Sequence, residues 1–269
     1  MRFTKVEATG NDFLVRLEPA TAPLPPALVA ALCDRHRGVG ADGVITIGPG
    51  VDGADCTMLL QNADGGPAEI SGNGARAVAL VAAAAGLGTE TTLVVDTGSG
   101  RRVIRLDRDP SGSAIAAEVD MGPVTIGPSD LEVAVAGSTH RGDVVSVGNP
   151  PYVCFVPDPA AVDLDRIGPG IEHAPQFPER TNVHFVRVED PATITMHIWE
   201  RGVGPTLSCG SGACAAAAAA HARGLVGDTV TVRVPGGELT VTLGETARLA
   251  GPAVAVCEVE VDADRLLRS

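Results

Sequence analysis

The sequence predicts an α+β protein made of two similar lobes, each mostly β-strand with one central helix. Two observations carry this prediction. First, the phrase "SGNGARAVAL", which begins at Ser71, returns as "SCGSGACAAAA" around Cys209. Second, segments with strand-like alternation and glycine-rich turns lie on both sides of each phrase. We therefore expect each phrase to open the central helix of its own lobe.

The two phrases belong to an internal repeat whose offset is 209 − 71 = 138 residues. Isolated Ala and Gly matches arise by chance, but this one offset holds from the first strand to the hairpin after the helix. Two copies indicate two lobes rather than a solenoid. The matched pairs include Gly10-Asn11 with Gly148-Asn149, Met58 with Met196, Gly86-Leu87 with Gly224-Leu225, and Val94 with Val232.

The repeat also predicts the domain boundaries. Residues 1–122 are expected to form the N-terminal lobe, with a strand near 252–269 as a candidate to complete it. Residues 123–269 are expected to form the C-terminal lobe, and Pro123 to Asp130 is a candidate linker.

The order of elements is expected to be the same in both lobes. The first lobe shows a strand at "VEATGNDFLV", a helix within "LPPALVAALCDRH", a strand at "DCTMLLQN", the alanine-rich helix, a hairpin at "TTLVVDTGSGRRVIRL" and a strand at "AIAAEVDMGPV". The second shows "VSVGNPPYV", a weaker helix near "PAAVDLDRI", "TITMHIWE", the second alanine-rich helix, "DTVTVRVPGGELTVTL" and "AVAVCEVEVDA". Gly86 and Gly224 are expected to end the two central helices as C-caps.

Composition narrows the class of protein. Of 269 residues, 45% are hydrophobic but only 3% aromatic, so Val, Leu, Ile and Ala must build the core. The net charge of −13 argues against nucleic acid or an anionic membrane as a partner. No uninterrupted apolar run reaches about 18 residues and no apolar signal-peptide core opens the chain, which predicts a cytoplasmic protein without a membrane span.

Cysteine and histidine spacing gives no sign of a metal site. The cysteines lack CxxC pairing, so reduced and mostly buried thiols are expected for Cys33, Cys56, Cys154, Cys209, Cys214 and Cys257. The histidines are expected to be surface side chains or core side chains with satisfied hydrogen bonds; we consider His36, His140, His173, His184 and His221.

The repeated phrase has a chemical interpretation. Gly-x-Gly at a helix start leaves backbone N–H groups open, and the helix dipole favours an anion there. Two such starts facing one cleft would hold a carboxylate or phosphate from both sides. Ser71 and Cys209 stand immediately before the glycines, where a thiolate is stabilised. Either phrase alone is compatible with a simple structural turn.

Several longer motifs together resemble the diaminopimelate epimerase family over essentially the whole chain. They are "TGNDFLV", "HRGVGADGVI" at His36–Ile45, "QNADGGPAEISGNGAR" at Gln61–Arg76, "GNP" at Gly148–Pro150, "FPERTNVHFV" at Phe177–Val186 and "WERGVGPTLSCGSGACAAA" at Trp199–Ala217.

This resemblance implies a fold of two pseudo-symmetric lobes, each a mainly antiparallel sheet wrapped around a central helix. It implies an isomerase of lysine biosynthesis that needs no cofactor or metal and interconverts LL- and meso-diaminopimelate. In the family one cysteine thiolate removes the α-proton while the other thiol protonates the opposite face. The resemblance also implies a homodimer, although no segment of the sequence itself demands one.

Site residues carry over where the motifs match. Cys209 and Ser71 stand at the catalytic positions. The reacting end of a diamino acid would be held by Asn11, Gly72, Asn73, Gly210 and Ser211. The distal ammonium and carboxylate would be read by Asn62, Asn149, Asn182, Glu200 and Arg201, since Arg suits a carboxylate and Glu an ammonium.

The chain departs from the family at three positions. Ser71 replaces the first catalytic cysteine, and a hydroxyl is a much weaker acid than a thiol. Pro151 stands where the family usually has His after "GNP", and Pro205 stands where it usually has Glu. A Cys-to-Ser change engineered to trap substrate would not bring the two prolines with it, so natural divergence is the better interpretation.

Three hypotheses follow. The leading one is an epimerase in which Cys209 is the acid or base and Ser71 a hydroxyl relay. The second is a one-base lyase or dehydratase on an amino acid, parallel to members of the related proline-racemase branch with Ser or Thr at one cysteine position. The third is an impaired paralogue that only binds amino acids. A phosphate-binding nucleotide loop is a poor fourth, because neither glycine phrase ends in Lys-Ser/Thr.

Overall fold

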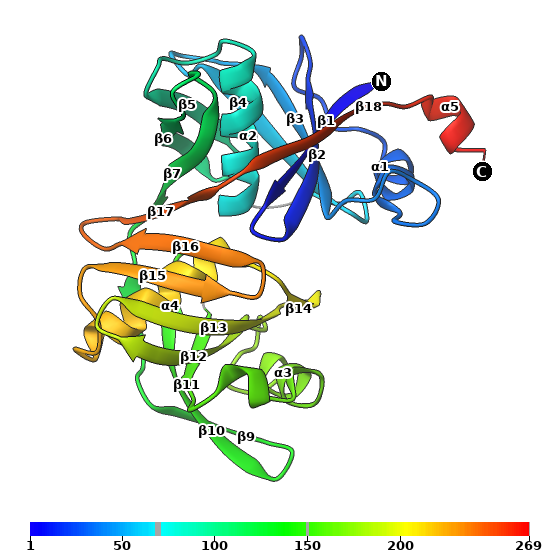
Figure 1. Ribbon diagram of the computed structural model, residues 1–269. Helices are drawn as coiled ribbons and strands as arrows, with labels where there is room; N and C mark the ends of the chain where they lie inside the picture. The colour runs from blue at the N-terminus through cyan, green and yellow to red at the C-terminus, as the bar shows by residue number, and fades with distance from the viewer. Residues whose placement is uncertain (68–70, 149–150, 269) are drawn as a thin grey trace. The chain divides into compact units, whose positions relative to one another are not determined.

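The computed structural model describes residues 1–67, 71–148 and 151–268. These residues form two compact units (Figure 1). One comprises Met1–Val119 together with Gly251–Ser269, and the other comprises Asp120–Ala250. Each unit is a sheet-rich α+β structure, and the predicted fold class is confirmed.

The first unit consists of strands around one buried helix. Its elements are β1 (Arg2–Ala8), β2 (Asn11–Leu17), α1 (Pro26–Cys33), β3 (Gly43–Pro49), β4 (Cys56–Asn62), α2 (Gly72–Ala84), β5 (Thr92–Thr97), β6 (Gly100–Arg108), β7 (Ala114–Gly122), β18 (Val254–Glu260) and α5 (Ala263–Leu266). The β2–β3 and β4–β5 pairs are parallel, whereas the other described pairs are antiparallel. Helix α2 contacts β1–β4, β6 and β18.

The second unit repeats this plan. Its elements are β8 (Thr125–Ile126), β9 (Leu131–Val135), β10 (Ser138–Ser146), β11 (Tyr152–Phe155), the 3₁₀ turn η1 (Pro159–Ala161), α3 (Leu164–Glu172), β12 (Val183–Asp190), β13 (Thr193–Glu200), β14 (Gly204–Thr206), α4 (Gly210–Ala222), β15 (Thr229–Val234), β16 (Gly237–Thr242) and β17 (Ala247–Pro252). Parallel β11–β12 and β13–β15 pairs recur among antiparallel ones.

The bounds of the central helices reproduce the repeat: adding 138 to Gly72–Ala84 gives Gly210–Ala222. Both helices end as predicted. Gly86 has φ 77° and Gly224 has φ 69°, the left-handed backbone that glycine tolerates. The following residues close the turn, with Leu87 N–H donating to Ala82 O at 2.9 Å.

Alanine explains how sheets can close around these helices. Nearly every residue of α4 from Ala213 to Ala220 is fully buried, although the helix has no amphipathic stripe. Short side chains let the surrounding strands pack close to the helix axis, so few aromatic rings are needed to fill the core.

Two sequence expectations need correction. The segment "VEATGNDFLV" is not one strand but the junction of β1 and β2, which pair antiparallel across a turn at Thr9 and Gly10. The expected linker Pro123–Asp130 contains strand β8, which pairs with β10.

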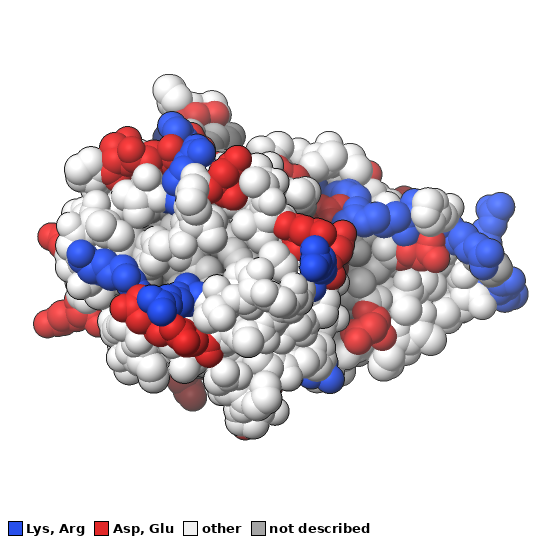
Figure 2. All heavy atoms as spheres, turned by 90° about the horizontal axis from the view of Figure 1, so that it is seen from below, with Lys and Arg blue, Asp and Glu red and all other residues white. Residues whose placement is uncertain are grey.

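The surface in Figure 2 carries acidic side chains beside basic ones, so this face presents no large field of a single sign despite the net charge of −13. The part of the chain that the structure describes holds no helix with the length and hydropathy needed to span a membrane.

Candidate active site

Helix α2 begins at Gly72 because Ser71 caps it. Ser71 has an extended backbone (φ −112°, ψ 122°), and its Oγ accepts the N–H of Gly74 at 3.1 Å. Serine is among the preferred N-cap residues because its hydroxyl satisfies one of the open N–H groups. Ser71 is therefore both a good structural cap and a hydroxyl placed at the helix start.

Helix α4 begins in the same way, with a thiol in the capping position. Cys209 is also extended (φ −139°, ψ 111°), and its Sγ accepts the N–H of Gly212 at 3.4 Å. The hydroxyl Oγ of Ser211 lies 3.6 Å from the same sulfur. The two phrases thus fold into equivalent caps that differ in the capping atom, oxygen or sulfur.

Each helix start keeps backbone N–H groups that have no partner within the helix. Ser71 O accepts the N–H of Ala75 at 2.8 Å, and Cys209 O accepts the N–H of Ala213 at 2.9 Å. Ahead of these bonds lie the N–H groups that a helix start offers to an anion. They belong to Gly72, Asn73, Gly210 and Ser211.

The environment of Cys209 keeps its thiol protonated. Burial, and after it the Glu200 carboxylate, raise the pKa of Cys209 to about 12. Hydrogen bonds from the Ser211 hydroxyl and from the N–H groups of Gly212 and Ser211 act in the opposite direction but do not outweigh burial. In the free protein Cys209 is therefore an acid, and a positive charge is needed nearby before it can serve as a base.

The first unit brings two predicted site residues into contact. Asn73 Nδ2 donates to Asn11 Oδ1 at 3.2 Å, and Asn11 Nδ2 donates to Asp42 Oδ2 at 2.6 Å. Asn73 as a whole residue is only 2% exposed. Its side-chain Nδ2 is already occupied by Asn11, which leaves the backbone N–H of Asn73 as its donor at the helix start.

In the second unit, Asn182, Glu200 and Arg201 gather where β12 begins and β13 ends. Asn182 Oδ1 accepts the backbone N–H of Arg201 at 2.8 Å. Glu200 Oε1 accepts the hydroxyl of Thr206 at 2.6 Å, and Arg201 Nη1 donates to Glu179 O at 3.0 Å. The Glu200 carboxylate and the Arg201 guanidinium thus belong to neighbouring residues at the end of β13.

The remaining site residues are less connected. Asn62 is exposed at the end of β4, where its N–H donates to Gly66 O at 2.9 Å. Asn149 lies outside the described residues. Of the two prolines that replace family residues, Pro151 is buried and Pro205 is exposed on β14. Neither can supply a titrating group.

His184 is a feature of this site that the sequence did not predict. It was expected to be a surface histidine or a satisfied core histidine, and this is wrong. Its side chain is fully buried, and neither ring nitrogen has a hydrogen-bond partner among the described residues. The ring packs against Gly212, the residue whose N–H caps onto Cys209.

We expect a Gly212→Ala substitution to be far more damaging than Gly74→Ala. At Gly212 an added Cβ would fall on the His184 ring, 2.6 Å from Nε2. At Gly74 it would meet the flexible Met58 Cε at 3.1 Å and Ile45 Cδ1 at 3.3 Å. Overpacking should lower the free energy of unfolding by about 2–3 kcal/mol at Gly212, and by less than about 1 kcal/mol at Gly74, where the better helix propensity of Ala offsets it. Urea unfolding followed by circular dichroism checks both; equal losses would contradict the packing argument.

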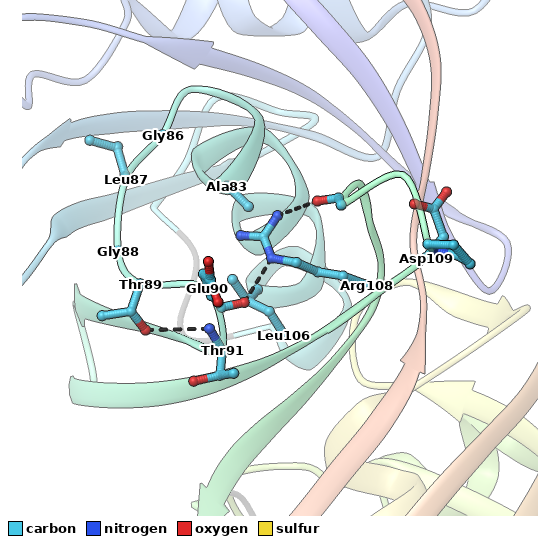
Figure 3. A pocket seen from close by; sticks show the side chains of 12 residues that line it. Ala83, Gly86, Leu87, Gly88, Thr89, Glu90, Thr91, Leu106, Arg108 and Asp109 are labelled. Carbon is cyan, nitrogen blue, oxygen red and sulfur yellow. Dashed lines mark hydrogen bonds between the residues drawn. The ribbon is translucent and has the colours of Figure 1, made fainter.

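A hollow in the described residues lies away from these helix starts. It has a volume of about 880 Å³ and sits at the C-terminal end of α2, beside Ala83 and Gly86 (Figure 3). Arg108 crosses it, with Nε donating to Glu90 O and Nη1 to Gly112 O, both at 2.7 Å. Because it lies at the opposite end of α2 from Ser71, it is separate from the candidate site. The described residues also include no cluster of three or more His, Cys, Asp or Glu suited to a metal ion.

Comparisons with known proteins agree with this architecture. The family model described as diaminopimelate epimerase matches residues 3–127 and 144–256. A diaminopimelate epimerase from Desulfitobacterium hafniense is 40% identical over 95% of this chain and 96% of its own, and one from Methanothermobacter thermautotrophicus is 38% identical over 94% and 96%.

Solved structures extend the likeness at the level of the fold. A hydroxyproline epimerase from Agrobacterium vitis has a TM-score of 0.72 at 17% identity, covering 96% of this chain and 91% of that one. A predicted epimerase from Pseudomonas aeruginosa has a TM-score of 0.72 at 18% identity, covering 97% and 98%.

The family model and the curated relatives place this two-lobed protein in the epimerase class of isomerases. The family match covers both lobes, and its curated relatives match along nearly their whole length. The chain belongs to the diaminopimelate epimerase family, as its motifs predicted.

Proposed function

We propose that this protein inverts the α-carbon of an amino acid by proton transfer, with LL- and meso-diaminopimelate or a close analogue as its substrates. The observation that carries the proposal is the pair of equivalent helix starts, capped by Ser71 and Cys209, each offering backbone N–H groups to a carboxylate. Curated relatives that bear the diaminopimelate epimerase name support the choice of substrate.

The N–H groups of a helix start would stabilise the negative charge that develops when the α-proton leaves. Cys209 would exchange that proton with the α-carbon. Its pKa of about 12 in the free protein suits the thiol as donor. A bound substrate ammonium would lower this pKa by its charge and let the thiolate act as base. Ser71 would hold the partner position as a hydroxyl.

The distal end of a diamino acid gives the second part of the proposal. Arg201 would bind a carboxylate and Glu200 an ammonium, with amide groups between them. Asn182 is already bonded to the backbone of Arg201, which fixes the turn that carries both charges. Asn62 and Asn149 would complete this distal group.

Loss of the α-proton signal in deuterated water tests the function. LL- and meso-diaminopimelate are incubated with the protein, with Cys209→Ala and with Cys257→Ala, which removes an exposed thiol elsewhere. We expect exchange and inversion in the wild type, a loss of about 100-fold or more in Cys209→Ala, since general acid–base groups contribute roughly 10²–10⁴-fold, and no change in Cys257→Ala. Exchange that survives in Cys209→Ala would overturn the assignment of the thiol.

The serine itself favours a second candidate. With a single thiol at the two caps, Cys209 could remove the α-proton while a leaving group departs from the neighbouring carbon. An amino acid with a β-leaving group would then yield an olefin or an oxo-acid, visible in the same spectra. Formation of such a product without inversion would favour a one-base lyase. Binding without proton exchange would instead indicate a protein that only binds amino acids.

A further inference from the structure

A polar network joins the start of β2 to the start of β3. These strands are parallel, with Phe13 beside Gly43, so the residues just before them lie close together. Asp42 uses one carboxylate oxygen, Oδ2, for two bonds. It accepts the Asn11 side-chain Nδ2 at 2.6 Å and the Asp12 backbone N–H at 3.0 Å.

Charged groups hold this network in place. Arg35 Nη2 donates to Asp42 Oδ1 at 2.7 Å, and Arg35 also binds both carboxylate oxygens of Asp12, at 3.1 and 2.7 Å. Lys5 Nζ lies 2.9 Å from Asp12. Burial alone would raise the pKa of Asp12, but the hydrogen bonds and charges of Arg35 and Lys5 outweigh it and lower that pKa. The Arg35 guanidinium is thus shared by the carboxylates of Asp12 and Asp42.

Both oxygens of the Asp42 carboxylate act as acceptors in these bonds, and this determines the orientation of the next two amides. Asn11 must turn Nδ2 toward Asp42, which leaves its Oδ1 to accept Nδ2 of Asn73 at 3.2 Å. Asn73 is the second residue of α2 and is 2% exposed. A chain of three side chains therefore runs from a fixed carboxylate to the first turn of the helix.

We propose that Asp42 is a positioning residue for the helix start of the first unit. Through Asn11 and Asn73 it fixes the first turn of α2, so that the N–H groups of Gly72 and Asn73 are held in place for the carboxylate of an amino-acid substrate. The identity of that anion rests on the proposed function, whereas the ordering of the turn does not.

The second unit lacks this device among its described residues. Strand pairing sets Val44 opposite Gln61 and Val183 opposite Trp199, which makes Thr181 the counterpart of Asp42. Ser211 stands at the position of Asn73. The Thr181 hydroxyl therefore stands in place of the Asp42 carboxylate, and the Ser211 hydroxyl stands in place of the Asn73 amide. The unit with Ser71 would be the pre-ordered anchor, while the unit with Cys209 carries the proton-transferring thiol.

The experiment compares Asp42→Ala and Asp42→Asn with Lys5→Met. Lys5→Met removes an ion pair from the same network without touching Asp42 or Asn11. Amide hydrogen exchange is measured at Gly74 and Ala75 in the free protein, and KM and kcat are measured with diaminopimelate. We expect Asp42→Ala to speed exchange at these amides by about tenfold or more, because local opening becomes easier, and to raise KM more than it lowers kcat. Asp42→Asn should change amide exchange and KM less than Asp42→Ala does, since the new amide oxygen can still accept a hydrogen bond from Asn11. Lys5→Met leaves the bonds between Asp42, Asn11 and Asn73 intact, so it should change exchange and KM by much less.

The readouts separate this proposal from the proposed function. Unchanged exchange in Asp42→Ala overturns the positioning role whatever the turnover. Equal acceleration in Lys5→Met also overturns it, since the effect would then be general loss of stability. Acceleration confined to the Asp42 variants, in a protein that turns over no diamino acid, supports the positioning role and contradicts the proposed substrate.

Discussion

Ser71→Cys is expected to raise the rate of α-carbon inversion by about 100-fold or more, because it restores a thiol at the partner position and acid–base groups contribute roughly 10²–10⁴-fold. The substituted sulfur should occupy the capping geometry that Cys209 Sγ already has at the equivalent helix start. Proton nuclear magnetic resonance of diaminopimelate in deuterated water measures both exchange and inversion.

The same substitution should cost stability. Serine is a preferred N-cap, and replacing its bond from Gly74 N–H by a weaker bond to sulfur should lower the free energy of unfolding by about 0.5–1 kcal/mol. Ser71→Thr keeps a capping hydroxyl and should change neither rate nor stability by much. Adding Pro151→His to Ser71→Cys returns a basic ring at the position where the family usually has one, and should raise the rate further. If Ser71→Cys inverts no faster than the wild type, the first unit takes no part in proton transfer.

His184→Ile is expected to stabilise the protein. Each buried polar group left without a partner costs about 1–3 kcal/mol, and both ring nitrogens of His184 are in this state among the described residues. The first unit supplies the replacement. Ile45 is the equivalent of His184 in the first unit. In the strand pairing, Ile45 lies opposite Leu60 and His184 lies opposite Ile198. Ile45 also packs against Gly74, as His184 packs against Gly212. We expect the free energy of unfolding to rise by about 2 kcal/mol at pH 7, measured by urea unfolding followed at Trp199.

The difference in unfolding free energy between His184→Ile and the wild type should grow as the pH falls. Burial lowers the pKa of His184 from 6.5 to about 3, so between these values the unfolded chain binds a proton that the folded chain does not. The stability of the wild type is therefore lost as the pH falls from 6.5 toward 3, by on the order of 4 kcal/mol in total from this group. His184→Ile removes that loss, whereas His36→Gln, at an exposed position, should not. Unfolding curves of wild type and His184→Ile that stay a constant distance apart from pH 7 to 4 would show that His184 does not control this pH dependence.

The repeat made the central helices predictable from the sequence. Their caps, glycine stops and lengths depend on local chemistry that is written twice, so each copy supports the other. Strands β3 and β12 are not among the strands that the sequence pattern predicts. Residues 43–48 are buried without interruption, which removes the alternation that identifies a half-exposed strand.

The candidate site was only partly predictable for a related reason. Ser71 and Cys209 stand next to the glycines that make the phrase visible. Asp42 lies 31 residues from Asn11, and only the parallel pairing of β2 and β3 brings them together. His184 also carried no local signal, because its burial against Gly212 depends on the packing of β12 on α4. The "HRGVGADGV" motif was the available clue to Asp42, since it contains Asp42 and directly follows Arg35.

The pairing of β1 with β18 has a consequence for the newly made chain. Arg2 pairs with Glu260, so β1 pairs with a strand that the ribosome makes long after β1 itself. The second unit, by contrast, is continuous from Asp120 to Ala250 and has all its strands available earlier. We expect the first unit to finish folding after the second, and its β1 edge to need protection from misassociation until β18 has been made.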